Sequence, residues 1–353
     1  MDNLKRQKFR DINLNDSFFD SLKEGYKEFG TWFENKAESK ALVLYNSSKK
    51  IEGFLFCKFE SGPGDDTTPL LPNTNHMKVG TFKFNPKGTR RGDRYLKKIF
   101  DYALADKSNP QDIYVTVFEK EHSYLVELFT RYGFEKYGTK STQNGTEVVL
   151  LRNLNKMHGD INKDFPFIYP EGRKKFLLSI YPEHHTRLFP DSKLLTESPD
   201  TVKDISHSNS IHKIYICGMD GVMGMAPGDI ITIYRTSDTP GAAEYRSVAT
   251  SLCVVEDVHT ISTYENEDKF VRECVKYSVF SEKELRKIYR DKKYPYVIKF
   301  TYNTALPKRP IRRVLVNDVG ISRKEYWGVL ELSDIQFQTL LQKAEVDSKL
   351  IRY

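Results

Sequence analysis

Three cations lie in a short polar segment, residues 85–92, between two runs of apolar residues: Lys87, Arg90 and Arg91. The run before the segment alternates as a strand does, and the run after it repeats apolar side chains at helical spacing. The first N–H groups of a helix lack partners within the helix, and its dipole favours negative charge at that end. The pattern fits a phosphate-binding loop, and it fits an ordinary solvated connection equally well.

Ionisable side chains gather after the next strand-like run, Ile113–Phe118. Carboxylate, imidazole and phenol side chains can accept and donate protons at reacting atoms. The candidates for this role are Glu119, Glu121, His122 and Tyr124 near the end of this strand and Tyr132 on the later helix, and we favour Glu119, His122 and Tyr132. For each of them the alternative is a surface or packing residue.

The composition is that of a globular protein, with 39% hydrophobic and 13% aromatic residues among 353. A chain of this length exceeds one typical core, so we expect two domains. The net charge of +7 and the sequence pI near 8.9 favour anionic partners, such as nucleic acid or a phosphorylated cofactor.

The sequence gives no indication of a membrane or secreted protein. The N-terminal residues lack the apolar core of a signal peptide, and no apolar run approaches the roughly 20 residues that a membrane helix requires. Cys57, Cys217, Cys253 and Cys274 are scattered without metal or redox spacing, which fits reduced, buried thiols. We therefore expect a cytoplasmic protein. Its oligomeric state is not predicted.

Metal binding and nucleotide hydrolysis are not expected. His184 and His185 are adjacent, so on a helix their side chains diverge by about 100° and cannot easily hold one ion. Walker A, dinucleotide-binding and nucleophile-elbow patterns are absent from the sequence.

The first half of the chain predicts a mixed α/β domain over residues 1–154. One amphipathic helix is expected to begin near Asp16 and to carry an aromatic stripe as far as Phe33. Strands are expected at residues 41–45, 51–59, 77–84, 113–118 and 147–152, with a helix after each of the third and fourth. The long loop at residues 60–76 either covers a site or is disordered.

Residues 155–173 are polar, contain prolines and predict a linker. Residues 174–353 then give many short strands and few helices, which favours a small β-barrel or a curled sheet. The expected fold class is therefore α+β: an N-terminal mixed α/β sheet domain followed by a small β-barrel domain with short helices.

The order of elements from Met77 to Phe134 resembles the cofactor-binding core of GNAT superfamily acetyltransferases. Residues 91–96, Arg-Gly-Asp-Arg-Tyr-Leu, stand where that family has its pyrophosphate loop, and residues 129–134 stand at its later helical signature. The resemblance covers roughly residues 8–152 and implies acetyl-CoA as the cofactor. It implies that the following residues bind this cofactor: Phe82, Phe84, Lys87, Arg90, Arg91, Gly92, Asp93 and Arg94.

Three positions depart from the GNAT pattern. Arg94 and Leu96 occupy places where the family has small residues, so side chains crowd the approach of the backbone to phosphate. A guanidinium at Arg94 could supply charge in place of backbone contact. Phe129 stands where the family usually has its general-acid tyrosine, and a phenyl ring cannot donate a proton.

The second half is similar to ASCH domains, small PUA-like barrels associated with RNA. Residues 176–189 resemble the opening of such domains, and residues 226–235 resemble their Pro-Gly-Asp turn and strand. Of the polar motif that these domains often carry, only Lys193 is present, and Thr196 and Ser198 replace its acid and arginine. The hydrolytic chemistry of some relatives is therefore not expected.

RNA binding by charge and stacking remains open for this second domain, with a solvated basic face as the alternative. The candidate nucleic-acid residues are Lys174, Lys175, Arg187, Arg235, Arg246, Lys308, Arg309, Arg312 and Arg313.

The sequence thus predicts an acetyl-CoA-dependent N-acetyltransferase that acts on a primary amine. The fusion and the basic charge suggest an acceptor associated with RNA, tRNA or a ribonucleoprotein, recruited by the second domain. The alternative is a catalytically silent module that binds CoA or RNA, motivated by Arg94, Leu96 and Phe129. A toxin that acts on translation is a third candidate function, and no residue in the sequence favours or disfavours it.

Overall fold

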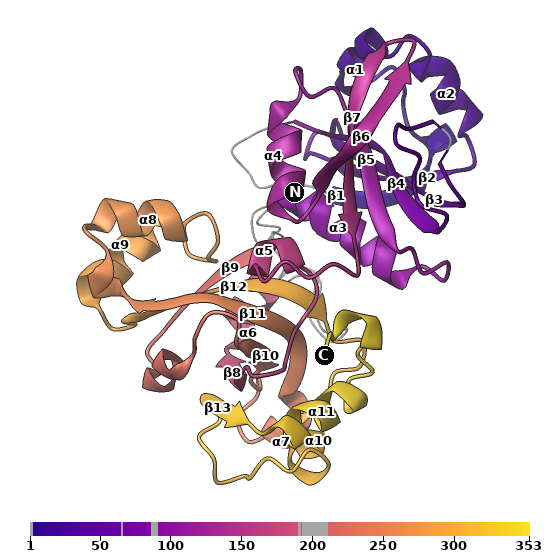
Figure 1. The fold of residues 1–353 in the computed structure, drawn as a ribbon. Helices are drawn as coiled ribbons and strands as arrows, with labels where there is room; N and C mark the ends of the chain where they lie inside the picture. Colours follow the sequence, from indigo (N-terminus) through magenta and orange to yellow (C-terminus); the bar gives the residue numbers. More distant parts are fainter. Residues whose placement is uncertain (1–2, 65, 86–90, 190–191, 193–210) are drawn as a thin grey trace. The chain divides into compact units, whose positions relative to one another are not determined.

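The computed structural model describes residues 3–64, 66–85, 91–189, 192 and 211–353. The chain forms two compact units, residues 1–164 and 165–353 (Figure 1). The boundary between them lies within the segment predicted as a linker.

A seven-stranded mixed sheet organises the first unit, in the order β1-β2-β3-β4-β5-β7-β6. Its strands are β1 (Asn3–Lys8), β2 (Lys40–Tyr45), β3 (Ile51–Ser61), β4 (Asn75–Phe84), β5 (Asp112–Val117), β6 (Glu135–Thr142) and β7 (Gly145–Asn153). Only β4 and β5 pair in parallel, as a helical crossover between them requires. The mixed α/β architecture is confirmed. The patterns missed β6, whose polar and small residues give no strand signal.

The helices of the first unit are α1 (Asp20–Gly25), α2 (Phe29–Asn35), α3 (Arg91–Ala105), α4 (Ser123–Arg131) and α5 (Ile161–Asp164). The prediction of one amphipathic helix from Asp16 to Phe33 was wrong, because the backbone becomes extended at Tyr26 (φ −133°, ψ 102°) and the helix divides into α1 and α2. The glycine before this break, Gly25, is a poor helix former.

The predicted apolar face of α3 packs into the core as expected. Tyr95, Leu96, Ile99, Phe100 and Ala103 are all buried. A second core of aromatic side chains lies where β2 and β3 meet the N-terminal helices. Phe9, Phe19 and Phe33 surround Phe54, with ring centroids 5.4 to 6.1 Å from that of Phe54.

The second unit contains a six-stranded mixed sheet in the order β13-β8-β10-β11-β12-β9. Its strands are β8 (Lys175–Ile180), β9 (His212–Cys217), β10 (Ile230–Arg235), β11 (Val248–Thr260), β12 (Tyr296–Ala305) and β13 (Val329–Leu332). No pairing joins β9 to β13, so the described strands do not close into a barrel, and of the two predicted forms the small β-barrel is not confirmed. The bulges in β11 fit a curved sheet.

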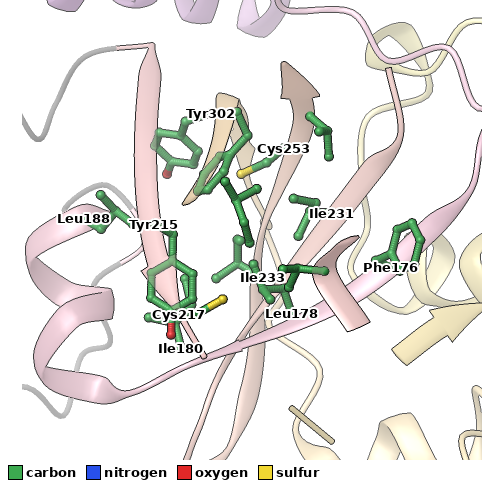
Figure 2. Close-up of a cluster of buried hydrophobic side chains, with 14 of the residues drawn as sticks. Phe176, Leu178, Ile180, Leu188, Tyr215, Cys217, Ile231, Ile233, Cys253 and Tyr302 are labelled. Atoms are coloured by element: carbon green, nitrogen blue, oxygen red, sulfur yellow. The ribbon is translucent and has the colours of Figure 1, made fainter. Parts of the chain in front are cut away.

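Side chains from five strands of this sheet meet in one apolar core, which Figure 2 shows. Phe176, Leu178 and Ile180 alternate along β8 toward Ile231 and Ile233 of β10. The helices are α6 (Pro182–Leu188), α7 (Ala243–Arg246), α8 (Glu267–Cys274), α9 (Glu282–Asp291), α10 (Arg312–Asn317) and α11 (Asp334–Lys343). Of these, α8 and α9 form a separate hairpin that packs on β9 and β12.

The four cysteines are free thiols, and three of them are buried. Burial raises the pKa of the partly accessible Cys57 thiol to about 12 and that of Cys217 to about 11, so both stay protonated at neutral pH. Over the described residues, no helix is long and apolar enough to cross a membrane.

The aromatic core should dominate the stability of the first unit. We expect Phe54→Ala to lower its free energy of unfolding by about 3–5 kcal/mol, because Phe54 is fully buried among three other rings. Phe59→Ala on the same strand is the matched control and should cost far less, since Phe59 is 38% exposed. Urea unfolding followed by Trp32 fluorescence in a Trp327→Phe background measures both, because the chain has two tryptophans. Equal losses for the two variants would contradict this account.

Candidate active site

The two central strands of the first unit separate partway along their length. β4 and β5 pair only from His76 and Asp112 to Val79 and Val115. Beyond that point β4 continues to pair with β3 as far as Phe84. On the edge that faces β5, residues 80–84 have no described strand paired with them. The backbone N–H and C=O groups of residues 80–84 on that edge are therefore left to bind something other than a neighbouring strand.

A bulge in β4 accompanies the separation. Opposite Phe56 and Cys57 of β3, the register passes from Thr81 to Val79 and leaves Gly80 without a partner. Such a bulge bends a strand and increases its local twist, which turns β4 away from β5. A Cβ at residue 80 would lie 3.0 Å from Cδ1 of Phe56, so glycine suits this close approach.

A cavity of about 980 Å³ lies at the separation of the two strands. Its walls come from α1, α2, β3, β4 from Lys78 onward, the end of β5, α4 and the β6–β7 hairpin. Apolar rings form part of the lining: Phe29, Trp32, Phe56, Phe82, Phe84, Phe118 and Phe129. The volume and the mixture of apolar walls with a few polar groups are typical of a binding site for a small molecule or cofactor.

A tyrosine and a glutamate meet in the wall of this cavity. Oη of Tyr26 donates to Oε1 of Glu147 at 2.8 Å, and Glu147 is only 4% exposed. Burial and then the Glu147 carboxylate raise the pKa of Tyr26 well above its ordinary value, so the phenol keeps its proton. The sequence could not indicate this pair, since the two residues are 121 positions apart and Tyr26 was placed on a core-facing stripe.

Three lysines lie on the same face of the sheet as Tyr114. Lys58 and Lys78 are opposite each other on β3 and β4, and Nζ of Lys78 lies 5.2 Å from the centroid of the Tyr114 ring. Lys140 of β6 completes the group, and all three lysines line the cavity. Burial and then the charge of Lys140 lower the pKa of Lys78 to about 8.

One carboxylate of β3 and one of the loop before β4 pair with these lysines. Asp66 pairs with Lys140 and lies 3.9 Å from Nζ of Lys78, while Glu60 pairs with Lys58. The loop reaches β6 through Thr68, which exchanges two backbone hydrogen bonds with Thr139. A Cβ at residue 138 would lie 2.2 Å from the carbonyl oxygen of Thr68, so only glycine allows this contact.

The structure separates the residues predicted to handle protons. Glu121, His122 and Tyr124 line the cavity just before and at the start of α4. Glu119 is not among the lining residues and instead pairs with Lys136 at 2.6 Å. Tyr132 is fully buried, and its Oη donates to Oδ1 of Asp93 at 3.2 Å.

Of the residues predicted to bind the cofactor, Phe82 and Phe84 line the cavity. Lys87 and Arg90 lie outside the described residues, as does the side chain of Arg91. The remaining three lie in the first turn of α3, and all are buried: Gly92, Asp93 and Arg94.

The first turn of α3 packs tightly against its surroundings. A Cβ at Gly92 would lie 2.9 Å from Cδ2 of Leu128 and 3.1 Å from Cζ of Phe84, so glycine permits close packing of α3 on β4 and α4. The Phe129 ring packs 5.2 Å from that of Phe82, between centroids. A phenyl ring at this position therefore serves packing.

Most of the nine cations predicted to contact nucleic acid have partners within the second unit. Lys175 and Arg235 are buried beside Asp334 and Asp238, respectively. Lys174, Arg246 and Lys308 form ion pairs at the surface with Glu331, Asp238 and Glu345, and Arg187 donates to the carbonyl oxygen of Val279. Arg309 is partly exposed.

The two remaining cations stack on aromatic rings. The guanidinium of Arg312 lies 4.2 Å from the Trp327 centroid, and that of Arg313 lies 5.8 Å from the Tyr245 centroid. Five of the nine residues therefore have a carboxylate partner within the second unit. RNA binding by this unit stays a prediction.

No protein-family model and no curated protein match the chain. Solved structures that are similar to part of it include an ASCH protein from Zymomonas mobilis, 14% identical, covering 48% of this chain and 95% of that chain with a TM-score of 0.31. They also include a GNAT-family acetyltransferase from Bacillus cereus, 17% identical, covering 45% of this chain and 99% of that chain with a TM-score of 0.29. Both families that the sequence resembles are therefore represented among the similar structures.

The environment of Lys78 predicts an unusual titration. After reductive methylation of the lysines, the methyl NMR signal of Lys78 should titrate with a midpoint near 8, because burial and Lys140 both disfavour its ammonium form. The signal is assigned by its loss in Lys78→Arg. A midpoint at the ordinary lysine value of about 10.4 would contradict the described arrangement.

Proposed function

We propose that the first unit is an acetyl-CoA-dependent N-acetyltransferase that acts on a primary amine. The observation that carries the proposal is the separation of β4 from β5, which leaves the edge of residues 80–84 facing a cavity of about 980 Å³. An extended amide-containing chain, such as the pantetheine arm of CoA, can pair with such an edge as a further strand would. The chain's own geometry thus supports the cofactor that the GNAT resemblance implies.

The residues of the cavity supply what acetyl transfer requires of a protein. When bound, acetyl-CoA supplies the acetyl thioester. The N–H groups of the β4 edge can donate to the thioester oxygen as it gains negative charge, which is the electrostatic contribution of an oxyanion hole. The apolar rings of Phe82, Phe84 and Phe129 exclude water from this region.

The Tyr26–Glu147 pair provides the proton chemistry in this proposal. An amine is nucleophilic only when neutral, so a carboxylate that accepts the proton of an incoming ammonium promotes attack. Glu147 is a buried carboxylate in the cavity and takes this role. Tyr26 keeps its proton because burial and Glu147 raise its pKa. Once the ammonium proton has passed from Glu147 to solvent, the C–N bond forms and the C–S bond breaks, Glu147 takes a second proton from the nitrogen, and the Tyr26 hydroxyl gives its proton to the leaving thiolate. The proton on Glu147 then passes to Tyr26 along their hydrogen bond, which restores both groups.

Calorimetry with acetyl-CoA and an assay of thiol release with a panel of primary amines test the proposal together. Binding of acetyl-CoA with amine-dependent thiol release is the expected result. Absence of binding at about millimolar acetyl-CoA would overturn the proposal, since Kd values in this range are already weak. Binding without turnover on any amine would favour the silent module.

Tyr26→Phe tests the proposed proton donor. We expect kcat to fall by roughly 10²- to 10⁴-fold, the usual contribution of general acid–base catalysis, while binding of acetyl-CoA is retained. Glu147→Gln should lower kcat within the same range. Tyr137→Phe is the matched control, because its hydroxyl donates to the carbonyl oxygen of Leu70 and does not line the cavity. An unchanged kcat in Tyr26→Phe would remove Tyr26 from the mechanism.

A further inference from the structure

Groups of opposite charge lie at two places in the wall of the same cavity. Carboxylates surround Tyr26, and ammonium groups surround Tyr114. Lys58, Lys78 and Lys140 line the cavity together with Glu28, Glu121 and Glu147. The cavity is therefore polarised, although it has nearly as many negative as positive side chains.

The acidic region is centred on the phenol of Tyr26. Besides accepting its hydrogen bond, Glu147 raises the pKa of Tyr26, and Glu28 and Glu121 raise it further by their charge, so all three carboxylates lie near this hydroxyl. The Tyr26 ring packs against Phe118, with centroids 5.5 Å apart. Carboxylates beside aromatic faces suit an ammonium group, through charge and through cation–π attraction.

The basic region has three lysines, and two neighbouring carboxylates pair with them. Lys58 pairs with Glu60, Lys140 pairs with Asp66, and Nζ of Lys78 lies 3.9 Å from Asp66; neither carboxylate is among the residues that line the cavity in the described part of the chain. Burial first, and then the positive charge of Lys140, lower the pKa of Lys78. An anion placed in the cavity would relieve this repulsion.

The two regions are adjacent. Lys140 of β6 is directly opposite Glu147 of β7 in the antiparallel register. The Cβ atoms of residues paired in this way lie about 4.5–5.5 Å apart. A ligand that contacts both residues needs its positive and negative groups only a few bonds apart.

We propose that the acceptor is a small zwitterion: a primary amine that also carries a carboxylate or a phosphate a few bonds from the nitrogen. This inference rests on the proposed acetyltransferase function and specifies its substrate class. The amine lies against Glu147 and Tyr26, and the anionic group lies against Lys140 and Lys78.

The same charges select against other amines. A polyamine would place a second cation near three lysines, where like charges repel in a partly buried site. An alkylamine that has no anionic group would leave the lysines without the added anion and would forgo a charge-assisted hydrogen bond. Discrimination between acceptors follows from both effects.

Matched pairs of acceptors test the proposal by kcat/KM with acetyl-CoA. L-leucine is compared with 3-methylbutylamine for the carboxylate, and O-phosphoethanolamine is compared with ethanolamine for the phosphate. We expect the anionic member of at least one pair to be preferred by about ten-fold or more, the effect of one charged hydrogen bond. The pair that shows the preference identifies the anion.

The variants Lys140→Gln and Lys136→Gln locate the effect. Lys140→Gln should reduce the preference for the anionic member by about ten-fold. Lys136 lies on the same strand, pairs with Glu119 and does not line the cavity, so Lys136→Gln should leave that preference unchanged. The effect is measured as the ratio of kcat/KM for two acceptors in the same variant. A smaller fraction of folded enzyme lowers both values equally and does not change this ratio.

The failure of this inference differs from the failure of the proposed function. If acetyl-CoA binds and the amines without an anionic group are acetylated as well as or better than both anionic partners, the zwitterionic acceptor is wrong and the acetyltransferase stands. The same conclusion follows if Lys140→Gln leaves the ratio of kcat/KM between the two members of a pair unchanged. If acetyl-CoA does not bind and no amine is acetylated, the proposed function itself is wrong and the inference falls with it.

Discussion

The candidate site depends on the loss of pairing between β4 and β5. A central strand in a sheet normally has both edges satisfied, because unpaired backbone groups in the interior are costly. Here the bulge at Gly80 ends the pairing at Val79 and Val115 while β3 still holds the other edge of β4. The sheet thus keeps its integrity on one side and exposes hydrogen-bonding backbone to a cavity on the other.

The break between α1 and α2 serves the same cavity. Tyr26 is partly buried against the aromatic core that contains Phe29 and Phe33, and its backbone is extended. Its hydroxyl donates to Glu147 on a distant strand. Glu147 is buried, and a buried carboxylate requires hydrogen bonds or opposite charge. Tyr26 and the neighbouring Lys140 meet that requirement.

Much of the fold follows from sequence periodicity, whereas the polar groups of the site do not. The alternation in β3 and β4 and the helical spacing in α3 are local signals, and the structure confirms them. Strand β6 was not predicted because its side chains are mostly polar. The helix break at Tyr26 was not predicted because the apolar spacing continues across the break. Of the proton-handling residues predicted, Glu121, His122 and Tyr124 line the cavity, whereas Glu119 and Tyr132 are not among its lining residues. Strand pairing places Lys140 beside Glu147, which binds Tyr26, and the long loop brings Asp66 to Lys140. These contacts join residues far apart in the sequence, so local sequence patterns cannot predict them.

The two units also show why net charge alone does not locate an anion site. The basic run in the second unit, including Lys308 and Arg312, has the denser concentration of cations in the sequence. In the structure Lys308 pairs with Glu345, and the guanidinium of Arg312 lies over the Trp327 ring. The lysines of the cavity are scattered along the sequence at positions 58, 78 and 140 and also have carboxylate partners, yet strand register brings them together. Burial strengthens the interactions of these charges relative to those of charges at an exposed surface. Folding can thus gather cations at one place without a basic run in the sequence.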